Sequence, residues 1–207
     1  MLLEPIFIFY FLILGSIVGF MAGLLGIGGG GIMVPVLTSL FLALGMPVEK
    51  VVHLALGTSM AAIVVTSISS LRAHHARGAV IWDYVKRMSP GILVGTFLAT
   101  YVVAFASSLA LAVFFSLFMG FIALKMFIDK KPMQQQVKPT GKKHLFLVGS
   151  GIGAISALVS IGGGSLTVPF LVSRHINIKK AIGTSAAIGL PISLAGTLGY
   201  VINGWQN

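Results

Sequence analysis

The sequence predicts an all-α protein that crosses a membrane several times and consists of two related halves inserted in opposite directions. Composition is the first of three observations behind this prediction. Of the 207 residues, 57% are hydrophobic and only 9% are charged, whereas charged residues make up about 25% of a soluble domain. So small a charged fraction cannot cover a water-exposed surface, and the apolar segments are therefore expected to contact the lipid bilayer.

An internal repeat is the second observation, and it divides the chain. The stretch 27–35, IGGGGIMVP, returns 134 residues later at 161–169 as IGGGSLTVP. After a shortened loop, the triplet at 57–59, Gly-Thr-Ser, returns at 183–185. The repeat predicts three parts, which are a first half at 1–128, a cytoplasmic linker at 129–144 and a second half at 145–207.

The distribution of basic residues is the third observation. Twelve of the fourteen Lys and Arg residues lie in three polar segments, at 72–89, 129–144 and 173–180. Cytoplasmic loops of membrane proteins are rich in Lys and Arg, so all three segments are expected in the cytoplasm. The two glycine stretches then open to opposite sides of the membrane. This is an inverted-topology repeat, a plan that recurs among secondary transporters.

In the first half, residues 6–25 have about the length that a bilayer-spanning helix needs. Its Gly15, Gly19 and Gly23 are spaced four apart, so they share one face and predict close contact with another helix. Residues 32–44 span only about 20 Å as a helix, which is too short to cross. The two segments are therefore expected to form a re-entrant or broken hairpin around the glycines.

The rest of the first half is expected to hold three crossing segments. Residues 52–71 are apolar but contain several Ser and Thr residues, and residues 72–89 predict a polar loop. Residues 90–104 and 108–128 then form a helical hairpin.

The second half repeats this order in part. A helix is expected at 145–160, a half-helix at 166–173 and a longer helix at 181–202. In the first of these, Gly149 and Gly153 correspond to Gly15 and Gly19. The last two helices of the first half have no counterparts, so the second half is expected to lack its last two helices.

The glycine stretch at 26–31 formally matches the dinucleotide fingerprint G-x-G-x-x-G. That fingerprint needs a preceding strand within a βαβ unit, whereas this stretch follows an apolar membrane segment. A phosphate-binding P-loop would continue with Lys and Ser or Thr, and Ile32 and Met33 stand there instead. Nucleotide binding is therefore excluded by the context of the motif.

An anion site agrees better with the repeated glycines. Glycine permits positive φ and leaves backbone N–H groups uncovered, and a helix N-terminus has unsatisfied N–H groups and a positive dipole end. Irregular backbone at membrane depth survives only where it is buried or lines a cavity. The two half-helix starts are therefore expected to meet near the membrane midplane and bind an anion. The alternative is that the glycines only permit tight helix crossing.

The predicted substrate-binding residues are those of the two glycine stretches and the two Gly-Thr-Ser triplets. They are Gly28, Gly29, Gly30, Gly162, Gly163, Gly164, Thr58, Ser59, Thr184 and Ser185. The four hydroxyls are possible donors to an anion, although Ser and Thr in membrane helices also bond to their own backbone carbonyls.

The remaining polar residues indicate no other chemistry. The five histidines lie at segment ends, which predicts solvated interfacial side chains, and no carboxylate lies inside an apolar segment. No cysteine is present, and no constellation for hydrolysis, metal catalysis or haem ligation is found. We therefore expect no enzyme, no metal and no cofactor. The net charge of +10 is explained by the cytoplasmic loops rather than by nucleic-acid binding.

Taken together, these motifs resemble those of the sulfite exporter TauE/SafE family of bacterial membrane permeases. The resemblance rests on the paired glycine motifs, each followed by Val-Pro, and on the Gly-Thr-Ser triplets, and it covers nearly the whole chain. It implies a multi-pass permease of the bacterial cytoplasmic membrane that carries small sulfur-containing anions such as sulfite, thiosulfate or organosulfonates. A non-transporting membrane scaffold or accessory subunit is the alternative function, and the oligomeric state is left open.

Overall fold

The computed structural model describes residues 9, 12–13, 15–20, 29–128 and 141–204, and all regular structure in these residues is helical. Residues 15–20 belong to an N-terminal helical piece. The later helices are α2 (Gly30–Ala43), α3 (Val48–Ala76), α4 (Trp82–Ala104), α5 (Ser108–Ile128), α6 (Lys142–Val159), α7 (Gly164–Ser173) and α8 (Ile178–Gly204). The all-α prediction is therefore confirmed for the part of the chain that is described.

Helices α3, α4 and α8 are long and apolar enough to cross a membrane, judged by length and composition. Their outward faces are also apolar: Leu98 on α4 and Leu198 on α8, for example, are 60% and 59% exposed. A helix that is apolar on its packed and its exposed face is typical of a membrane environment. Helices α2 and α7 are shorter, with 14 and 10 residues.

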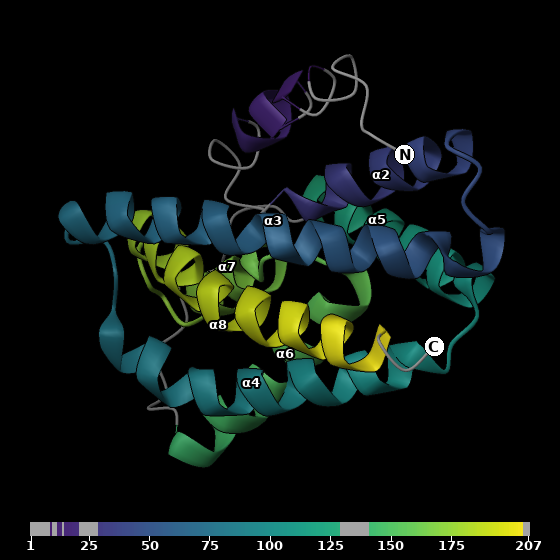
Figure 1. Ribbon diagram of the computed structural model, residues 1–207. Helices are drawn as coiled ribbons and strands as arrows, with labels where there is room; N and C mark the ends of the chain where they lie inside the picture. Colours follow the sequence, from purple (N-terminus) through teal and green to yellow (C-terminus); the bar gives the residue numbers. More distant parts are fainter. Residues whose placement is uncertain (1–8, 10–11, 14, 21–28, 129–140, 205–207) are drawn as a thin grey trace.

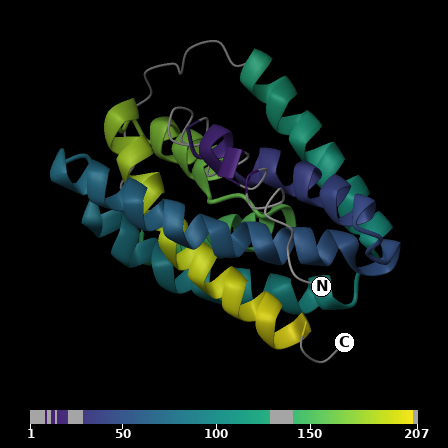
Figure 2. The same ribbon diagram turned by 45° about the horizontal axis from the view of Figure 1, so that its top comes forward.

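The long helices form a layer in which α8 lies between α3 and α4 (Figure 1). Helix α6 packs against α4, and α2 packs against α3. Figure 2 shows α5 along one margin of the bundle. Fully buried side chains from α3, α4 and α8, such as Met60, Ile92 and Ile188, fill the centre.

The polar loop predicted at 72–89 is wrong in extent, because α3 continues to Ala76 and α4 begins at Trp82. The Lys and Arg residues there are good helix formers, so a polar segment can remain helical where a helix leaves the apolar layer. Arg87 and Asp83 form an i,i+4 ion pair of 2.7 Å in the first turns of α4. The turn itself is short, with Gly78 at a positive φ of 64°.

Glycines bring α4 and α6 into close contact, as predicted for Gly149 and Gly153. A Cβ atom at Gly149 would lie 2.6 Å from the Met88 carbonyl oxygen, and one at Gly153 would lie 2.5 Å from the Ile92 carbonyl oxygen. The same prediction for Gly15 and Gly19 finds no support among the described residues, of which none lies within 4 Å of a Cβ at either position. Gly23 lies outside the described residues.

This difference predicts opposite effects of one substitution at equivalent positions. Gly149→Ala is expected to destabilise the protein by about 1–3 kcal/mol, because its Cβ overpacks the α4 backbone. Gly15→Ala is expected to be neutral or slightly stabilising, because alanine has the higher helix propensity. Thermal unfolding of the two purified variants in detergent, monitored by size exclusion, measures both changes in stability. Equal destabilisation by the two would show that α4–α6 contact is not the cause.

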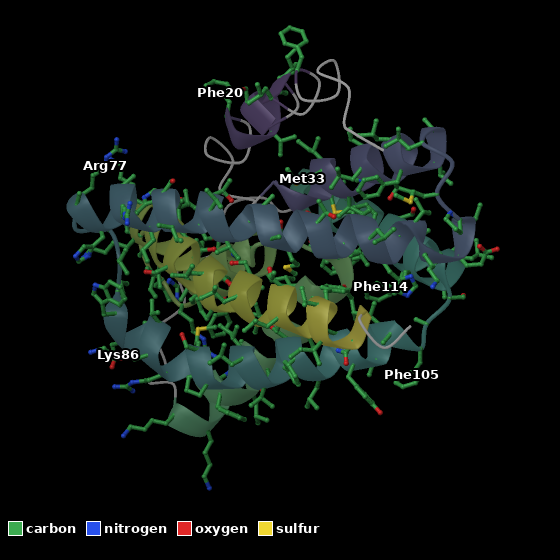
Figure 3. All side chains as sticks on the ribbon, in the orientation of Figure 1. Phe20, Met33, Arg77, Lys86, Phe105 and Phe114 are labelled. Atoms are coloured by element: carbon green, nitrogen blue, oxygen red, sulfur yellow. The ribbon has the colours of Figure 1, made fainter. Side chains whose placement is uncertain are left out.

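The chain reverses direction between α6 and α7, which brings the start of α6 close to the end of α7. The guanidinium of Arg174, just after α7, lies 3.0 Å from the Nε2 atom of His144 near the start of α6. Both ends therefore lie on the same side of the molecule. Figure 3 shows Arg77 and Lys86 at one end of the bundle and Phe105 at the opposite end.

The orientation of the chain in the membrane can be tested by labelling these two ends. The chain contains no cysteine, so single cysteines can be added without background. Arg77→Cys is expected to react with a membrane-impermeant thiol reagent only from the cytoplasm, and Phe105→Cys only from outside. Labelling of both from one side in intact cells would contradict the assignment of the basic segments to the cytoplasm.

Candidate functional site

The two glycine stretches have the same backbone geometry where the short helices begin. Gly29 precedes α2 with φ 70° and ψ −23°, and Gly163 precedes α7 with φ 78° and ψ −12°. Both conformations are left-handed, which glycine adopts readily and other residues do not. These two positions are equivalent in the repeat. Gly28, also predicted at the site, lies outside the described residues.

Each short helix starts with backbone amides that its own turn cannot satisfy. The Gly29 carbonyl accepts from the amides of Ile32 and Met33, and the Gly163 carbonyl accepts from those of Leu166 and Thr167. The amides before these, in the first two residues of each helix, have no carbonyl one turn earlier. No side chain caps either helix start. Each start thus combines N–H donors with the positive end of a helix dipole.

The first glycine stretch contacts the beginning of the second. A Cβ atom at Gly30 would overlap the carbonyl group of Ser160, the residue that follows α6. Only glycine fits at position 30, because the Ser160 backbone occupies the space of any side chain. The Ser160 hydroxyl in turn donates to the Leu56 carbonyl on α3, at 3.0 Å. The start of α2 and the end of α6, which belong to different halves of the repeat, therefore meet beside α3.

The second glycine stretch lies against α8. A Cβ atom at Gly163 would lie 2.5 Å from Cδ1 of Ile192. One at Gly189 would lie 2.9 Å from the carbonyl oxygen of Gly162 and 3.0 Å from the Ser67 hydroxyl. Gly162, Gly163 and Gly164 are all buried. Two backbones can approach this closely only where side chains are absent.

Buried hydroxyls without a partner lie on the helices around these stretches. Within the described part of the chain, Ser59, Thr167 and Ser185 have hydroxyls with no hydrogen-bond partner. Ser59 shares a face of α3 with Leu56 and Ile63, which contact Ser160 and approach position 30. Ser185 shares a face of α8 with Gly189. An unpartnered hydroxyl in a buried site is costly unless a ligand or water satisfies it.

Thr58 and Thr184 lie apart from this junction. Thr184 accepts a hydrogen bond of 3.0 Å from the Ile81 amide, at the turn before α4. Thr58 instead lines a pocket between α3, α4 and α8. Of the four predicted hydroxyls, Ser59 and Ser185 are therefore the two that lie on helix faces toward the glycine stretches.

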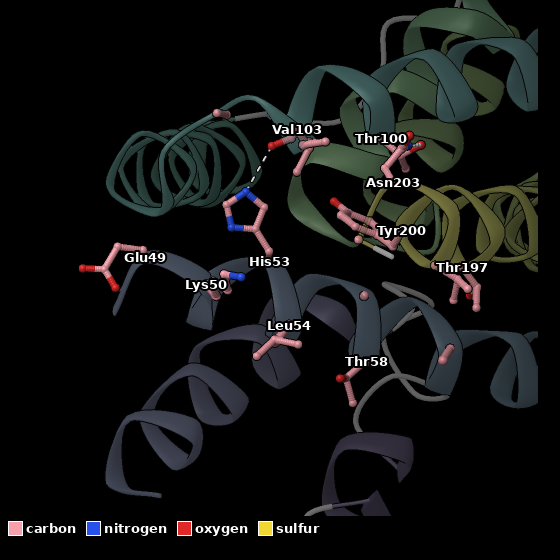
Figure 4. Close-up of a pocket in the computed structure, with 16 residues that line it drawn as sticks. Glu49, Lys50, His53, Leu54, Thr58, Thr100, Val103, Thr197, Tyr200 and Asn203 are labelled. Carbon is pink, nitrogen blue, oxygen red and sulfur yellow. Dashed lines mark hydrogen bonds between the residues drawn. The ribbon is translucent and has the colours of Figure 1, made fainter. Parts of the chain in front are cut away.

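The pocket has a volume of about 560 Å³ and combines apolar walls with a small set of polar groups (Figure 4). The polar lining consists of Glu49, Lys50, His53, Thr58, Thr100, Thr197, Tyr200 and Asn203. The Tyr200 hydroxyl donates to the Ala157 carbonyl at 2.8 Å, one turn before Ser160. The pocket therefore reaches from the end of the bundle near Phe105 toward the chain that leads into the second glycine stretch.

Two residues of this region were not predicted from the sequence. His53 was expected to be a solvated interfacial side chain, and that is wrong, because both of its ring nitrogens have partners within the protein. Ser160 has a left-handed conformation, with φ 49° and ψ 44°. Its counterpart in the repeat is Gly26. Because glycine adopts left-handed conformations readily, Gly26 could have indicated that the equivalent Ser160 is left-handed.

A metal site finds no support in the described residues, where no three His, Asp or Glu side chains gather. The polar groups around the glycine stretches include hydroxyls and helix-start amides, which are donors suited to an anion, beside the carbonyl oxygens of Ser160 and Gly162.

Comparison with known proteins shows the family of this chain. Residues 11–207 match the protein family described as Sulfite exporter TauE/SafE. The chain belongs to the TauE/SafE family. The family description and the name of a relative indicate that the chain is a membrane transporter rather than an enzyme.

The chain is also similar to several curated transporters. It is 36% identical over 201 residues to a probable membrane transporter protein of Haemophilus influenzae, covering 97% of this chain and 76% of that protein. A probable membrane transporter protein of Methanocaldococcus jannaschii is 30% identical, with 97% and 73% covered. The probable membrane transporter protein YdhB of Bacillus subtilis is 26% identical, with 91% and 77% covered. No solved structure matches the chain.

Proposed function

We propose that this TauE/SafE member is a permease of the bacterial cytoplasmic membrane for small sulfur-containing anions such as sulfite, thiosulfate or organosulfonates. The family description supports sulfite as a substrate, and the names of the relatives support membrane transport. The proposed anion site is formed by the two glycine stretches and the hydroxyls of Ser59 and Ser185, with Thr58 and Thr184, the residues just before them, on adjacent faces of α3 and α8.

The observation that carries this proposal is the repeated left-handed glycine before a short helix. Gly29 and Gly163 are equivalent in the repeat and have nearly the same φ and ψ. Each is followed by backbone amides and a positive helix end, a combination that binds anions. Gly30 lies against Ser160, so the two stretches belong to one buried region. Neutral donors in such a region can replace the water around an anion without supplying a permanent charge.

An inverted repeat would give this site access from both sides of the membrane. In this proposal residues 1–128 and 145–207 are the two halves, joined by the linker at 129–144. The α6–α7 hairpin begins and ends at one side, as the contact of His144 with Arg174 supports. The related hairpin before α3 would open to the other side. Rocking one hairpin against the other around the fixed site is the movement that such transporters use.

Binding of the anion can be tested by linkage. A ligand that binds only the folded protein raises its melting temperature with concentration. Sulfite or ethanesulfonate is expected to raise the melting temperature of purified protein by several degrees at a concentration about 100 times its Kd. Choline chloride at equal ionic strength serves as the control. Equal shifts by the sulfonate and by choline chloride would contradict a specific anion site.

A further inference from the structure

We propose that the bend at 160–163, between α6 and α7, binds a sodium ion beside the anion. The ligands are the carbonyl oxygens of Ser160 and Gly162 and the hydroxyls of Ser67 and Ser185. This inference rests on the proposed function, because it assigns a partner ion to the same buried region. It concerns oxygen acceptors, whereas the proposed anion site uses N–H and O–H donors.

Two carbonyl groups of the bend are turned toward neighbouring helices. The Ser160 carbonyl lies against Gly30 at the start of α2, and the Gly162 carbonyl lies against Gly189 of α8. Ser160 and Gly162 are both buried. Among the hydrogen bonds of the described turns and helix ends, no backbone amide donates to either oxygen. Buried carbonyl oxygens need a partner, and a cation can be that partner.

The Ser67 hydroxyl and the Gly162 carbonyl are directed at the same space. A Cβ atom at Gly189 would lie 2.9 Å from the Gly162 oxygen and 3.0 Å from the Ser67 oxygen. Ser67 is buried in α3. Ser185 lies one turn before Gly189 on α8, and its hydroxyl is buried without a partner. The missing side chain of Gly189 therefore leaves a small space between oxygens from α3, α8 and the bend.

Charge in this region favours a monovalent cation. Ser160 caps the C-terminus of α6, where the carbonyl groups carry the negative end of the helix dipole. Helix breaks in membrane transporters coordinate sodium through such carbonyls. The four carboxylates of the chain lie elsewhere, namely Glu4, Glu49, Asp83 and Asp129. Neutral oxygens suit a singly charged ion, because proteins generally bind divalent ions with carboxylates. The small space at Gly189 favours sodium over the larger potassium ion.

A sodium ion at the bend would also offset the charge of the anion. The proposed anion site contains only neutral donors, so an anion bound there alone would be a buried charge without a counter-charge. Opposite charges a few ångströms apart attract each other strongly where water is excluded. The Ser185 hydroxyl can donate its hydrogen to the anion while its lone pairs face the cation. Each ion is therefore expected to strengthen binding of the other.

The first test measures ethanesulfonate binding to the purified full chain by calorimetry. The buffers have equal ionic strength, their cation is sodium, potassium or choline, and ethanesulfonate is added as the salt of the same cation. We expect about tenfold tighter binding in sodium than in choline, with the affinity in potassium closer to that in choline. Equal affinities in all three buffers would overturn the sodium site and leave the anion site standing.

Sodium binding also has a readout that does not need the anion. Sodium chloride is expected to raise the melting temperature above that in choline chloride of equal ionic strength, because sodium binds only the folded protein. A sodium-dependent shift without ethanesulfonate binding in any buffer would support the sodium site and count against the proposed function. Equal melting temperatures in sodium chloride and choline chloride would overturn the sodium site.

Substitutions on α3 and α8 test the position of the ion. Ser67→Ala removes one oxygen without adding an atom, and Gly189→Ala fills the space between the oxygens. Both are expected to abolish the effect of sodium on affinity and on melting temperature. Ser69, exposed on α3, supplies the control Ser69→Ala, which should retain both effects. Melting in choline chloride shows whether each variant is folded. Persistence of the sodium effects in Ser67→Ala, or their loss in Ser69→Ala, would overturn the assignment, whether or not Gly189→Ala folds.

Discussion

Alanine at Gly30 is expected to destabilise the protein by about 3 kcal/mol or more, the largest effect among the single substitutions considered. The added Cβ would overlap the Ser160 carbonyl group. This neighbour is backbone, and its own position is held by the bond from the Ser160 hydroxyl to Leu56. Neither partner can move by a side-chain rotation, so α2 or the end of α6 must shift. Yield and melting temperature of the purified variant measure the effect.

The adjacent glycine supplies the matched control. A Cβ at Gly31 would lie 2.8 Å from the terminal methyl group of Met119, the flexible end of a side chain. Gly31→Ala is therefore expected to change the melting temperature little, although it has the same change in helix propensity. Similar melting temperatures for the two variants would contradict the contact between the two glycine stretches.

Alanine at Gly163 is expected to reduce transport per folded molecule by about tenfold or more. Its φ of 78° is left-handed, which costs an alanine roughly 1–2 kcal/mol. Its Cβ would also lie 2.5 Å from Cδ1 of Ile192. Both effects displace the start of α7, where the proposed amide donors lie. Gly29→Ala should reduce transport comparably, because Gly29 has the equivalent conformation before α2.

A packing glycine separates loss of transport from loss of folding. Gly149→Ala is expected to lower stability through α4, yet the folded fraction should transport normally. All variants are purified, matched for folded protein by size exclusion and assayed for radiolabelled sulfite flux. If Gly29→Ala and Gly163→Ala gave normal flux per folded molecule, the repeated glycine motif would be a packing device.

Repetition made much of the fold predictable from the sequence. One copy of a glycine run can arise from packing alone, but the return of IGGG before a Val-Pro pair indicates a shared backbone geometry. The left-handed Gly29 and Gly163 have that shared geometry. The half-helices were also predictable, because their apolar runs are too short to cross a bilayer.

Helix ends were less predictable, because polarity and helix termination are different properties. Residues 72–76 and 82–89 are polar but remain helical, stabilised in part by the Asp83–Arg87 pair. The segment predicted at 90–104 begins at Pro90, yet Pro90 lies inside α4. Helix breaks at proline depend on whether the preceding turn can adjust, and the sequence does not carry that information.

The partners of individual residues in contacts between distant segments were the least predictable feature. Gly15 and Gly149 occupy the same position in the repeat, but only Gly149 meets a neighbouring helix in the described chain. His53 is similar in this respect: its partners Val103 and Ser108 lie about 50 residues further along the chain. A single sequence shows which residue types are present, whereas the partner of a polar group depends on the packing.

Uptake of radiolabelled sulfite into proteoliposomes that contain only the purified chain is the measurement that tests transport most directly. We predict that the uptake saturates with sulfite concentration, is competed by ethanesulfonate but not by choline, and falls about tenfold with Gly163→Ala. Uptake by the wild-type protein that is no faster than leakage into protein-free liposomes would contradict it.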